Sequence, residues 1–174
     1  CAGYERSGKP NKAYLDEAVS QAKMADVVIL CIGLDESSES EGLDRTHICI
    51  PAVQKEVLNA VTAVNPNVVA VVSAGSVIET DWAAKCKAVV HGYLGGQAGA
   101  GAMMEVLTGW QNPCGKLAET IPLRYEDTPA ARYFPGRKQN AEYREGLYVG
   151  YRYYETANKA VRYPFGYGLS YTTF

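Results

Sequence analysis

The sequence has no excess of either charge and no long apolar run. Seventeen Lys and Arg residues stand against nineteen Asp and Glu residues, which leaves a formal net charge of −2. This balance argues against nucleic acid or an anionic membrane as the main partner, because no basic surface dominates. No apolar segment approaches the roughly 18 residues that suggest a membrane-spanning helix. The first residues also lack the apolar stretch of a signal peptide.

Cysteine and histidine are too few and too dispersed for a disulfide framework or a metal centre. The five cysteines form no C-x-x-C pair and lie far apart: Cys1, Cys31, Cys49, Cys86 and Cys114. The two histidines are also widely separated, so we expect no metal and no cofactor. Unpaired thiols favour a reducing compartment such as the cytoplasm. Cys31 and Cys86 lie in or beside apolar segments, and we expect both to be small buried side chains.

What the sequence does contain is an alternation of helix and strand patterns up to residue 107. Apolar residues recur at helical spacing in three segments: 11–25, 51–64 and 97–107. Continuous apolar runs, typical of strands buried on both faces, occupy 26–33, 68–73 and 88–94. A short helix is expected around 81–85, and Pro51 suits the first position of its helix. The order predicts an α/β fold, an open and mostly parallel sheet with helices on both faces.

The rest of the chain is less regular. Residues 115–122 have the pattern of an edge strand that ends at Pro122. The remainder, 123–174, contains most of the 13 tyrosines, and we expect long loops and short strands there. Tyrosine suits both sugar rings and packed loops, and packing is the simpler interpretation. We expect one domain, 1–174, with its α/β core in 1–122 and an irregular tail after it.

An acidic loop, residues 35–45, follows the first predicted strand. Five carboxylates lie within ten residues: Asp35, Glu36, Glu39, Glu41 and Asp44. Ligands gather at the carboxyl ends of parallel strands, which makes this loop a candidate site. Crowded carboxylates repel one another, so at least one should keep its proton to higher pH, as a general acid requires. Carboxylates in a surface loop are nevertheless most often simply solvated, and that alternative stays open.

Two further residues bear on the shape of the acidic loop. Gly42 would let the backbone turn sharply at the tip and aim a neighbouring carboxylate. Arg45 is expected to pair with Asp44 or Asp35 and to hold the loop in shape.

A glycine-rich run, residues 95–101, follows a predicted strand and opens a helix, as in dinucleotide sites. It does not match G-x-G-x-x-G, and no acidic residue follows a second strand at the required distance. Close packing of strand against helix explains the glycines more simply. Asp81, Trp82 and His91 are expected to serve packing or capping. No G-x-S-x-G motif is present, which disfavours the hydrolase fold with a serine nucleophile.

Five segments occur in a fixed order over nearly the whole chain. They are 25–33 (ADVVILCIG), 40–45 (SEGLDR), 112–117 (NPCGKL), 143–154 (YREGLYVGYRYY) and 163–171 (YPFGYGLSY). Together they resemble the second, α/β-sandwich domain of glycoside hydrolase family 3, the β-glucosidase type. The last two segments are the most specific.

The resemblance implies a retaining glycosidase that acts on a β-glucoside or an oligosaccharide. A (β/α)8 barrel domain would carry the aspartate nucleophile. The sandwich domain would supply the acid/base glutamate from the loop with the pattern E-G-x-D-R, which is Glu41 here. Glu39 is the fallback, because it lies in the same loop two residues away.

Set against the family pattern, the chain lacks the N-terminal barrel domain and the first strands of the sandwich. We therefore expect little or no turnover from the chain alone, and a sheet edge left open for another segment to cover. Two alternatives remain. One is a non-catalytic carbohydrate-binding or interaction module with the same fold, and the other is a flavodoxin-like nucleotide binder.

Overall fold

The computed structural model of the chain describes residues 1–137 and 139–173. The chain forms two compact units. The first consists of Cys1–Leu43, Cys49–Ser76 and Asp81–Met103. The second consists of Asp44–Ile48, Val77–Thr80 and the described part of Met104–Phe174. No helix among the described residues has the length and apolar character needed to cross a membrane.

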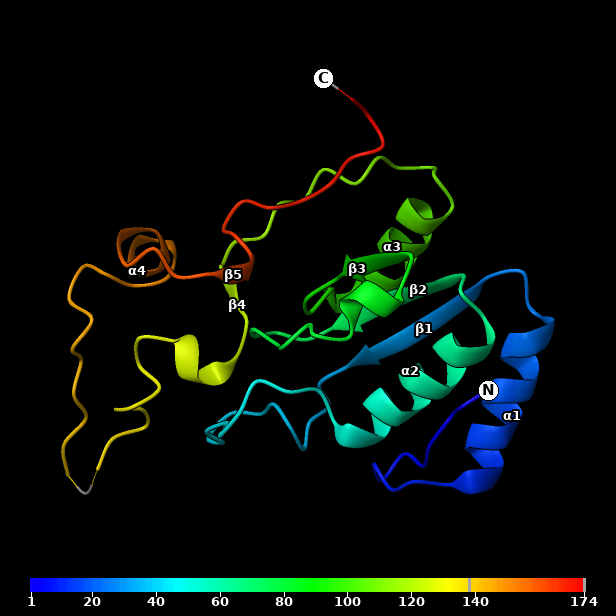
Figure 1. Cartoon of the computed structure of the whole chain (residues 1–174), viewed down its shortest axis with the longest axis horizontal. Coiled ribbons are helices and arrows are strands. Elements are labelled where there is room, and N and C mark those ends of the chain that lie inside the picture. The colour runs from blue at the N-terminus through cyan, green and yellow to red at the C-terminus, as the bar shows by residue number, and fades with distance from the viewer. Residues whose placement is uncertain (138, 174) are drawn as a thin grey trace. The chain divides into compact units, whose positions relative to one another are not determined.

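A three-stranded parallel sheet forms the centre of the first unit (Figure 1). Its strands are β1 (Val28–Gly33), β2 (Val68–Ser73) and β3 (Ala88–His91), with β2 in the middle. Val28 lies opposite Val68, and this register continues along both strands. Valine and isoleucine dominate these strands because branched side chains pack well on a pleated surface. The parallel sheet with its helices confirms the predicted α/β fold class.

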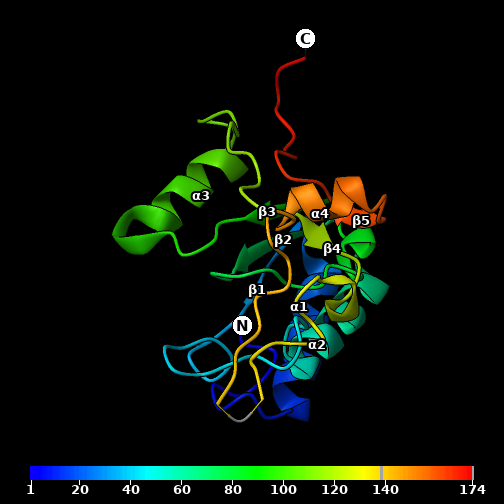
Figure 2. The ribbon, with the colours of Figure 1, turned by 90° about the vertical axis from the view of Figure 1, so that its left-hand side faces the viewer.

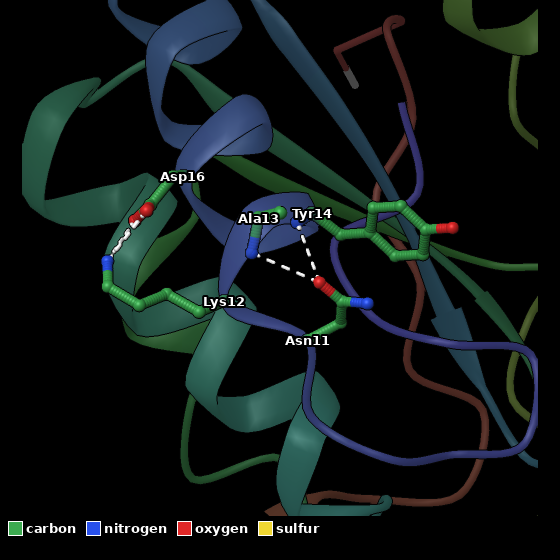
Figure 3. Close-up of polar contacts among 5 residues, drawn as sticks. All are labelled: Asn11, Lys12, Ala13, Tyr14 and Asp16. Atoms are coloured by element: carbon green, nitrogen blue, oxygen red, sulfur yellow. Dashed lines mark hydrogen bonds and ion pairs between the residues drawn. The ribbon is translucent and has the colours of Figure 1, made fainter.

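Helix α1 (Lys12–Met24) begins at an asparagine cap (Figure 3). The side-chain oxygen of Asn11 accepts hydrogen bonds from the backbone N–H groups of Ala13 and Tyr14, at 3.0 and 3.3 Å. The start of a helix leaves four such donors without intrahelical partners, and a cap of this kind contributes about 1 kcal/mol. The cap explains why the helix begins where the sequence pattern predicts.

Helix α2 (Ala52–Val64) packs beside α1 on one face of the sheet. Val57 and Val61 of α2 lie in one buried cluster with Ala22 of α1 and Val68 of β2. All four are no more than 5% exposed. Full burial of a valine side chain contributes about 1.5–3 kcal/mol, so this cluster stabilises the packing of the two helices against β2.

The other face of the sheet is covered less completely. Ile29 of β1 is 48% exposed and Cys31 is also exposed. The predictions that β1 is buried on both faces and that Cys31 is buried are therefore wrong, because alternate residues of β1 point away from α1 and α2. Helix α3 (Gly99–Leu107) starts on this side (Figure 2). Its Met103 packs where a Cβ on Gly92 would lie, only 1.7 Å from the Met103 Cε.

Several predicted elements of the first unit differ at their ends. Strand β3 stops at His91, because Tyr93 adopts a φ of +49° that turns the chain out of the sheet. The short helix expected around 81–85 is a single 3₁₀ turn, η1 (Ala83–Lys85). Pro51 is the N-cap of α2, with φ −50° and ψ 136°, rather than its first helical residue.

Antiparallel pairing between distant segments organises the second unit. Strand β4 (Ile121–Pro122) pairs with β5 (Val161–Tyr163). The Leu117 N–H donates to the Tyr167 carbonyl, and the Gly166 N–H donates to the Leu117 carbonyl, both at 2.8 Å. The predicted edge strand is regular only over its last two residues, and the residues before it bond to a turn instead.

The tyrosine-rich part of the second unit contains a helix that the sequence did not indicate. Helix α4 (Tyr151–Thr156) follows the 3₁₀ turn η3 (Tyr125–Asp127) in the chain. Tyr154 is 6% exposed, and the ring of Tyr151 packs on that of Phe165 with centroids 4.9 Å apart. These tyrosines pack against their neighbours, as the simpler interpretation of the sequence predicted.

Candidate functional site

The acidic loop leaves the sheet at Gly33, the last residue of β1. Gln54 is buried, and its Oε1 accepts the Gly33 N–H at 2.9 Å while its Nε2 donates to the Tyr4 hydroxyl at 3.1 Å. Gly33 has a φ of +154°, and a Cβ there would lie 1.9 Å from the Ser73 carbonyl oxygen. The start of the loop is therefore fixed by a residue that must be glycine and by a buried amide.

Asp35 shapes the first turn of the loop. Its Oδ1 accepts the Ser37 hydroxyl at 2.6 Å and the backbone N–H groups of Ser37 and Ser38 at 3.1 Å. These bonds, led by the one from the Ser37 hydroxyl, hold the pKa of Asp35 below its ordinary value. At Asp35 the shift is thus opposite to the one that crowding predicts, because hydrogen bonds to the charged form outweigh the other effects.

Glu39 connects the middle of the loop to the turn after β2. Its Oε2 accepts the Gly75 N–H at 2.8 Å, and its Oε1 accepts the Ser76 hydroxyl at 2.5 Å. The Glu39 side chain is half-buried. No sequence pattern indicates this contact, because Gly75 lies 36 positions after Glu39.

Glu41 occupies the tip of the loop. The Leu43 N–H donates to the Ser40 carbonyl at 3.3 Å and closes a turn with Glu41 and Gly42 at its centre. Gly42 has a φ of +76°, so the prediction of a sharp turn at this glycine is confirmed. Glu41 is exposed, and among the described residues its carboxylate has neither a hydrogen-bond nor an ion-pair partner. A carboxyl group held in this way can meet a ligand.

Arg45 lies at the end of the loop, in the second unit. The sequence predicted that it would pair with Asp44 or Asp35. In the structure its Nη1 donates to the Val77 carbonyl oxygen at 3.1 Å. The guanidinium therefore fastens the end of the loop to a neighbouring backbone segment of the same unit.

Asp81, Trp82 and His91 occupy supporting positions, in agreement with the expected packing roles. Partial burial draws the pKa of Asp81 upwards, but the ion pair with Lys55, at 2.9 Å, and backbone hydrogen bonds outweigh it and leave the pKa lowered. Trp82 is only 3% exposed. The His91 ring stacks on Tyr93 with centroids 4.0 Å apart, and burial lowers the pKa of His91.

The glycine-rich run makes one close backbone contact within itself. A Cβ on Gly95 would lie 2.7 Å from the Cα of Gly99, so the two backbones touch where η2 (Gly96–Ala98) leads into α3. Within residues 1–137 and 139–173, no group of three or more His, Cys, Asp or Glu residues is placed to hold a metal ion.

The chain is similar over nearly its whole length to known proteins. The family model described as the glycosyl hydrolase family 3 C-terminal domain matches residues 5–171. The thermostable beta-glucosidase B of Acetivibrio thermocellus is 48% identical over 160 residues, which is 92% of this chain and 21% of that protein. The exo-alpha-(1->6)-L-arabinopyranosidase of Bifidobacterium longum is 50% identical over 159 residues, 91% of this chain and 21% of that protein.

A solved structure shares the architecture. The crystal structure of the family 3 beta-glucosidase of Bifidobacterium adolescentis matches with a TM-score of 0.94 at 47% identity, and the match covers 98% of this chain and 26% of that one. The chain spans about a fifth of the length of the curated relatives named above.

Proposed function

The chain belongs to the C-terminal domain family of glycosyl hydrolase family 3, and on this premise we propose that it supplies the general acid/base of a retaining β-glucosidase-like enzyme. The proposed acid/base is Glu41. The observation that carries the proposal is the exposed turn at the carboxyl end of β1, where the motif SEGLDR presents Glu41 without a partner among the described residues. A barrel domain elsewhere in the protein would supply the aspartate nucleophile.

In this mechanism Glu41 acts twice. In the first step its carboxyl O–H gives a proton to the glycosidic oxygen, while the nucleophile bonds to the anomeric carbon and the leaving group departs. In the second step the Glu41 carboxylate takes a proton from water, and the resulting hydroxyl displaces the nucleophile from that carbon. A retaining mechanism needs the two carboxyl groups about 5–5.5 Å apart, so Glu41 must face the nucleophile across a narrow cleft.

Two features of the loop favour Glu41 over the fallback, Glu39. Both oxygens of Glu39 already accept hydrogen bonds from the turn after β2, at 2.8 and 2.5 Å. These two bonds hold the Glu39 carboxylate against that turn and away from the tip of the loop. Glu41 lies at the exposed corner of a turn, where a proton donor can reach a glycosidic oxygen.

The proposed substrate is a β-glucoside or a short oligosaccharide. Of the relatives, one is named as a beta-glucosidase and another as an exo-acting L-arabinopyranosidase. Both names describe removal of a pyranose sugar. An α-L-arabinopyranoside is therefore the substrate to compare with a β-glucoside.

The test uses the full-length protein that carries this chain, with Glu41→Ala. General acid catalysis typically contributes 10²–10⁴-fold, so kcat/KM for an alkyl glucoside should fall by about that factor. The loss should be much smaller for a dinitrophenyl glucoside, whose leaving group needs little protonation. Azide should restore part of the rate, because a small nucleophile can replace the activated water.

The matched control is Glu36→Ala, which removes another exposed carboxylate from the same loop and should change neither rate. An equal loss on both substrates without azide rescue would remove Glu41 from the acid/base role. Azide rescue of Glu39→Ala instead would transfer that role to Glu39.

A second candidate function, carbohydrate binding without catalysis, draws on a hollow in the second unit. Tyr133, Tyr148 and Tyr153 line it together with Arg144 and Glu145. Aromatic faces beside charged groups can hold a sugar ring. Calorimetric titration of the chain with glucose and cellobiose tests this function: micromolar binding would favour it, and no binding would favour half of a shared active site.

A further inference from the structure

We propose that Glu39 is a positioning residue that fastens the acidic loop to the turn after β2 and thereby holds Glu41 in place. We call the two hydrogen bonds from Gly75 and Ser76 to the Glu39 carboxylate the latch. The proposal deepens the proposed function and rests on it for its catalytic consequence. The latch itself is a property of the first unit and can be tested without any turnover.

Glu39 is held through both its backbone and its side chain. Its backbone N–H donates to the Asp35 carbonyl at 2.8 Å, which closes the first turn of the loop. Its carboxylate accepts the Gly75 N–H at 2.8 Å and the Ser76 hydroxyl at 2.5 Å. Hydrogen bonds to an ionised acceptor are roughly twice as strong as neutral ones, so this carboxylate suits the task.

The turn after β2 is shaped to receive the carboxylate. A Cβ on Gly75 would lie 3.2 Å from the Glu39 Oε1 and 2.8 Å from the Cδ1 of Leu94. Only glycine at position 75 leaves this space open to the Glu39 carboxylate. Ser76 follows directly, and its hydroxyl donates to the Oε1 of Glu39.

The catalytic consequence follows from distance along the chain. Glu41 lies two residues beyond Glu39, at the centre of the Ser40–Leu43 turn, and the turn has open space around Gly42. A proton donor must come within about 2.6–3.2 Å of the atom that it serves. A displacement of about 1 Å can cost roughly 10²-fold in rate, so a loop held only at its two ends would donate poorly.

The first experiment measures amide hydrogen exchange by NMR in the chain itself. With Glu39→Ala the Gly75 amide should exchange at least about tenfold faster, because its acceptor is gone and the local opening energy falls. The amides of Val71 and Val72 within β2 should keep their protection, which shows that the fold is intact. Glu36→Ala is the control and should leave the Gly75 amide unchanged.

A second variant separates the two halves of the latch. Ser76→Ala removes the hydroxyl donor but keeps the Gly75 bond. Exchange of the Gly75 amide should therefore accelerate less in Ser76→Ala than in Glu39→Ala. In the double variant Glu39→Ala/Ser76→Ala the Gly75 amide should exchange no faster than in Glu39→Ala alone, because the effects of substituting two partners of one contact are not additive. Full additivity would contradict a shared contact.

The second experiment uses the full-length protein. Glu39→Ala should lower kcat for an alkyl glucoside by about tenfold or more, with a smaller change in KM and an unchanged pH profile, because the proton donor is still Glu41. Azide should not restore the rate. Rescue by azide would mean that Glu39 is itself the acid/base, and wild-type activity in this variant would mean that the latch positions nothing.

The two proposals fail separately. If the Gly75 amide does not respond to Glu39→Ala while Glu41→Ala behaves as an acid/base variant, the latch is wrong and the proposed function stands. If the amide responds but Glu41→Ala shows no leaving-group dependence and no azide rescue, the fastening stands and its catalytic role is overturned together with the proposed function.

Discussion

The side chain of Asn65 ties the two helices of the first unit to the sheet. It is 6% exposed, and its Nδ2 donates to the carbonyl oxygens of Ala22 and Ala25, at 2.8 and 2.7 Å. Its Oδ1 accepts the Asn67 N–H at 2.8 Å. One amide thus donates to carbonyl groups at the end of α1, which have no partner within their own helix. The same amide accepts a hydrogen bond from the segment that leads into β2.

Asn65→Asp is the sharpest perturbation, because it changes no volume. It replaces the amide donor by an oxygen that faces two carbonyl oxygens. Two lost hydrogen bonds cost about 1–3 kcal/mol, and burial of a carboxylate oxygen that has no donor adds about 1–3 kcal/mol. The total, about 2–6 kcal/mol, is a large share of a typical domain stability of about 5–15 kcal/mol.

The cost of Asn65→Asp should depend on pH with a definite sign. Burial and the facing carbonyls favour the neutral acid, so the introduced carboxyl should have a raised folded pKa compared with about 3.9 when unfolded. The variant should therefore be least impaired near pH 4 and should lose stability as the pH rises. Asn65→Ala should cost about 2–4 kcal/mol with no such slope.

Urea unfolding followed by tryptophan fluorescence measures these differences. Trp82 is 3% exposed and reports on the first unit, whereas Trp110 is already 84% exposed and should change little. Asn67→Asp is the control: the Asn67 side chain makes an exposed bond at 3.2 Å, and the change should cost less than about 1 kcal/mol. A value for Asn65→Asp within 1 kcal/mol of the wild type at pH 7 would refute the argument.

Three further predictions concern pH and glycine. Asp81→Asn removes the ion pair with Lys55, so its destabilisation should be present above pH 3.8 and should vanish as the pH falls through the depressed pKa of Asp81; thermal melts across this range measure it, and a constant difference down to pH 2 would contradict it. Burial, with nearby negative charge, raises the pKa of Tyr154 to about 12, so stability should fall between pH 10 and 12. Tyr154→Phe should flatten that decline in an alkaline unfolding series. Gly33→Ala would place a Cβ 1.9 Å from a backbone oxygen and should abolish the fold seen by circular dichroism, whereas Gly42→Ala, with open space around it, should cost only about 1–2 kcal/mol.

The elements of the first unit could be predicted from the sequence because local patterns decide them. The apolar run 68–73 coincides with β2, and the cap at Asn11 fixes the start of α1. Exposure could not be predicted in the same way. The run of β1 is as apolar as that of β2, yet Ile29 is 48% exposed, because burial depends on what lies over the sheet and not on the strand itself.

Some features of the acidic loop could likewise be predicted from the sequence and others could not. Its position after β1 and the turn at Gly42 follow from the sequence. The direction of the pKa shift at Asp35 does not, because it depends on the orientation of two serine groups. The hydrogen bonds that distinguish Glu39 from Glu41 also could not be predicted, because their donors, Gly75 and Ser76, lie far away along the chain.

The pairing in the second unit has a consequence for biosynthesis. The Asn112 side chain bonds the Tyr171 N–H at 2.8 Å and the Ser170 hydroxyl at 2.9 Å, across 58–59 residues of chain. While the ribosome is still making that stretch, residues around 112–117 have no partner to bond. Every residue of the first unit lies at or before Met103, so this unit can begin to fold while the second unit still lacks the residues that pair with Asn112.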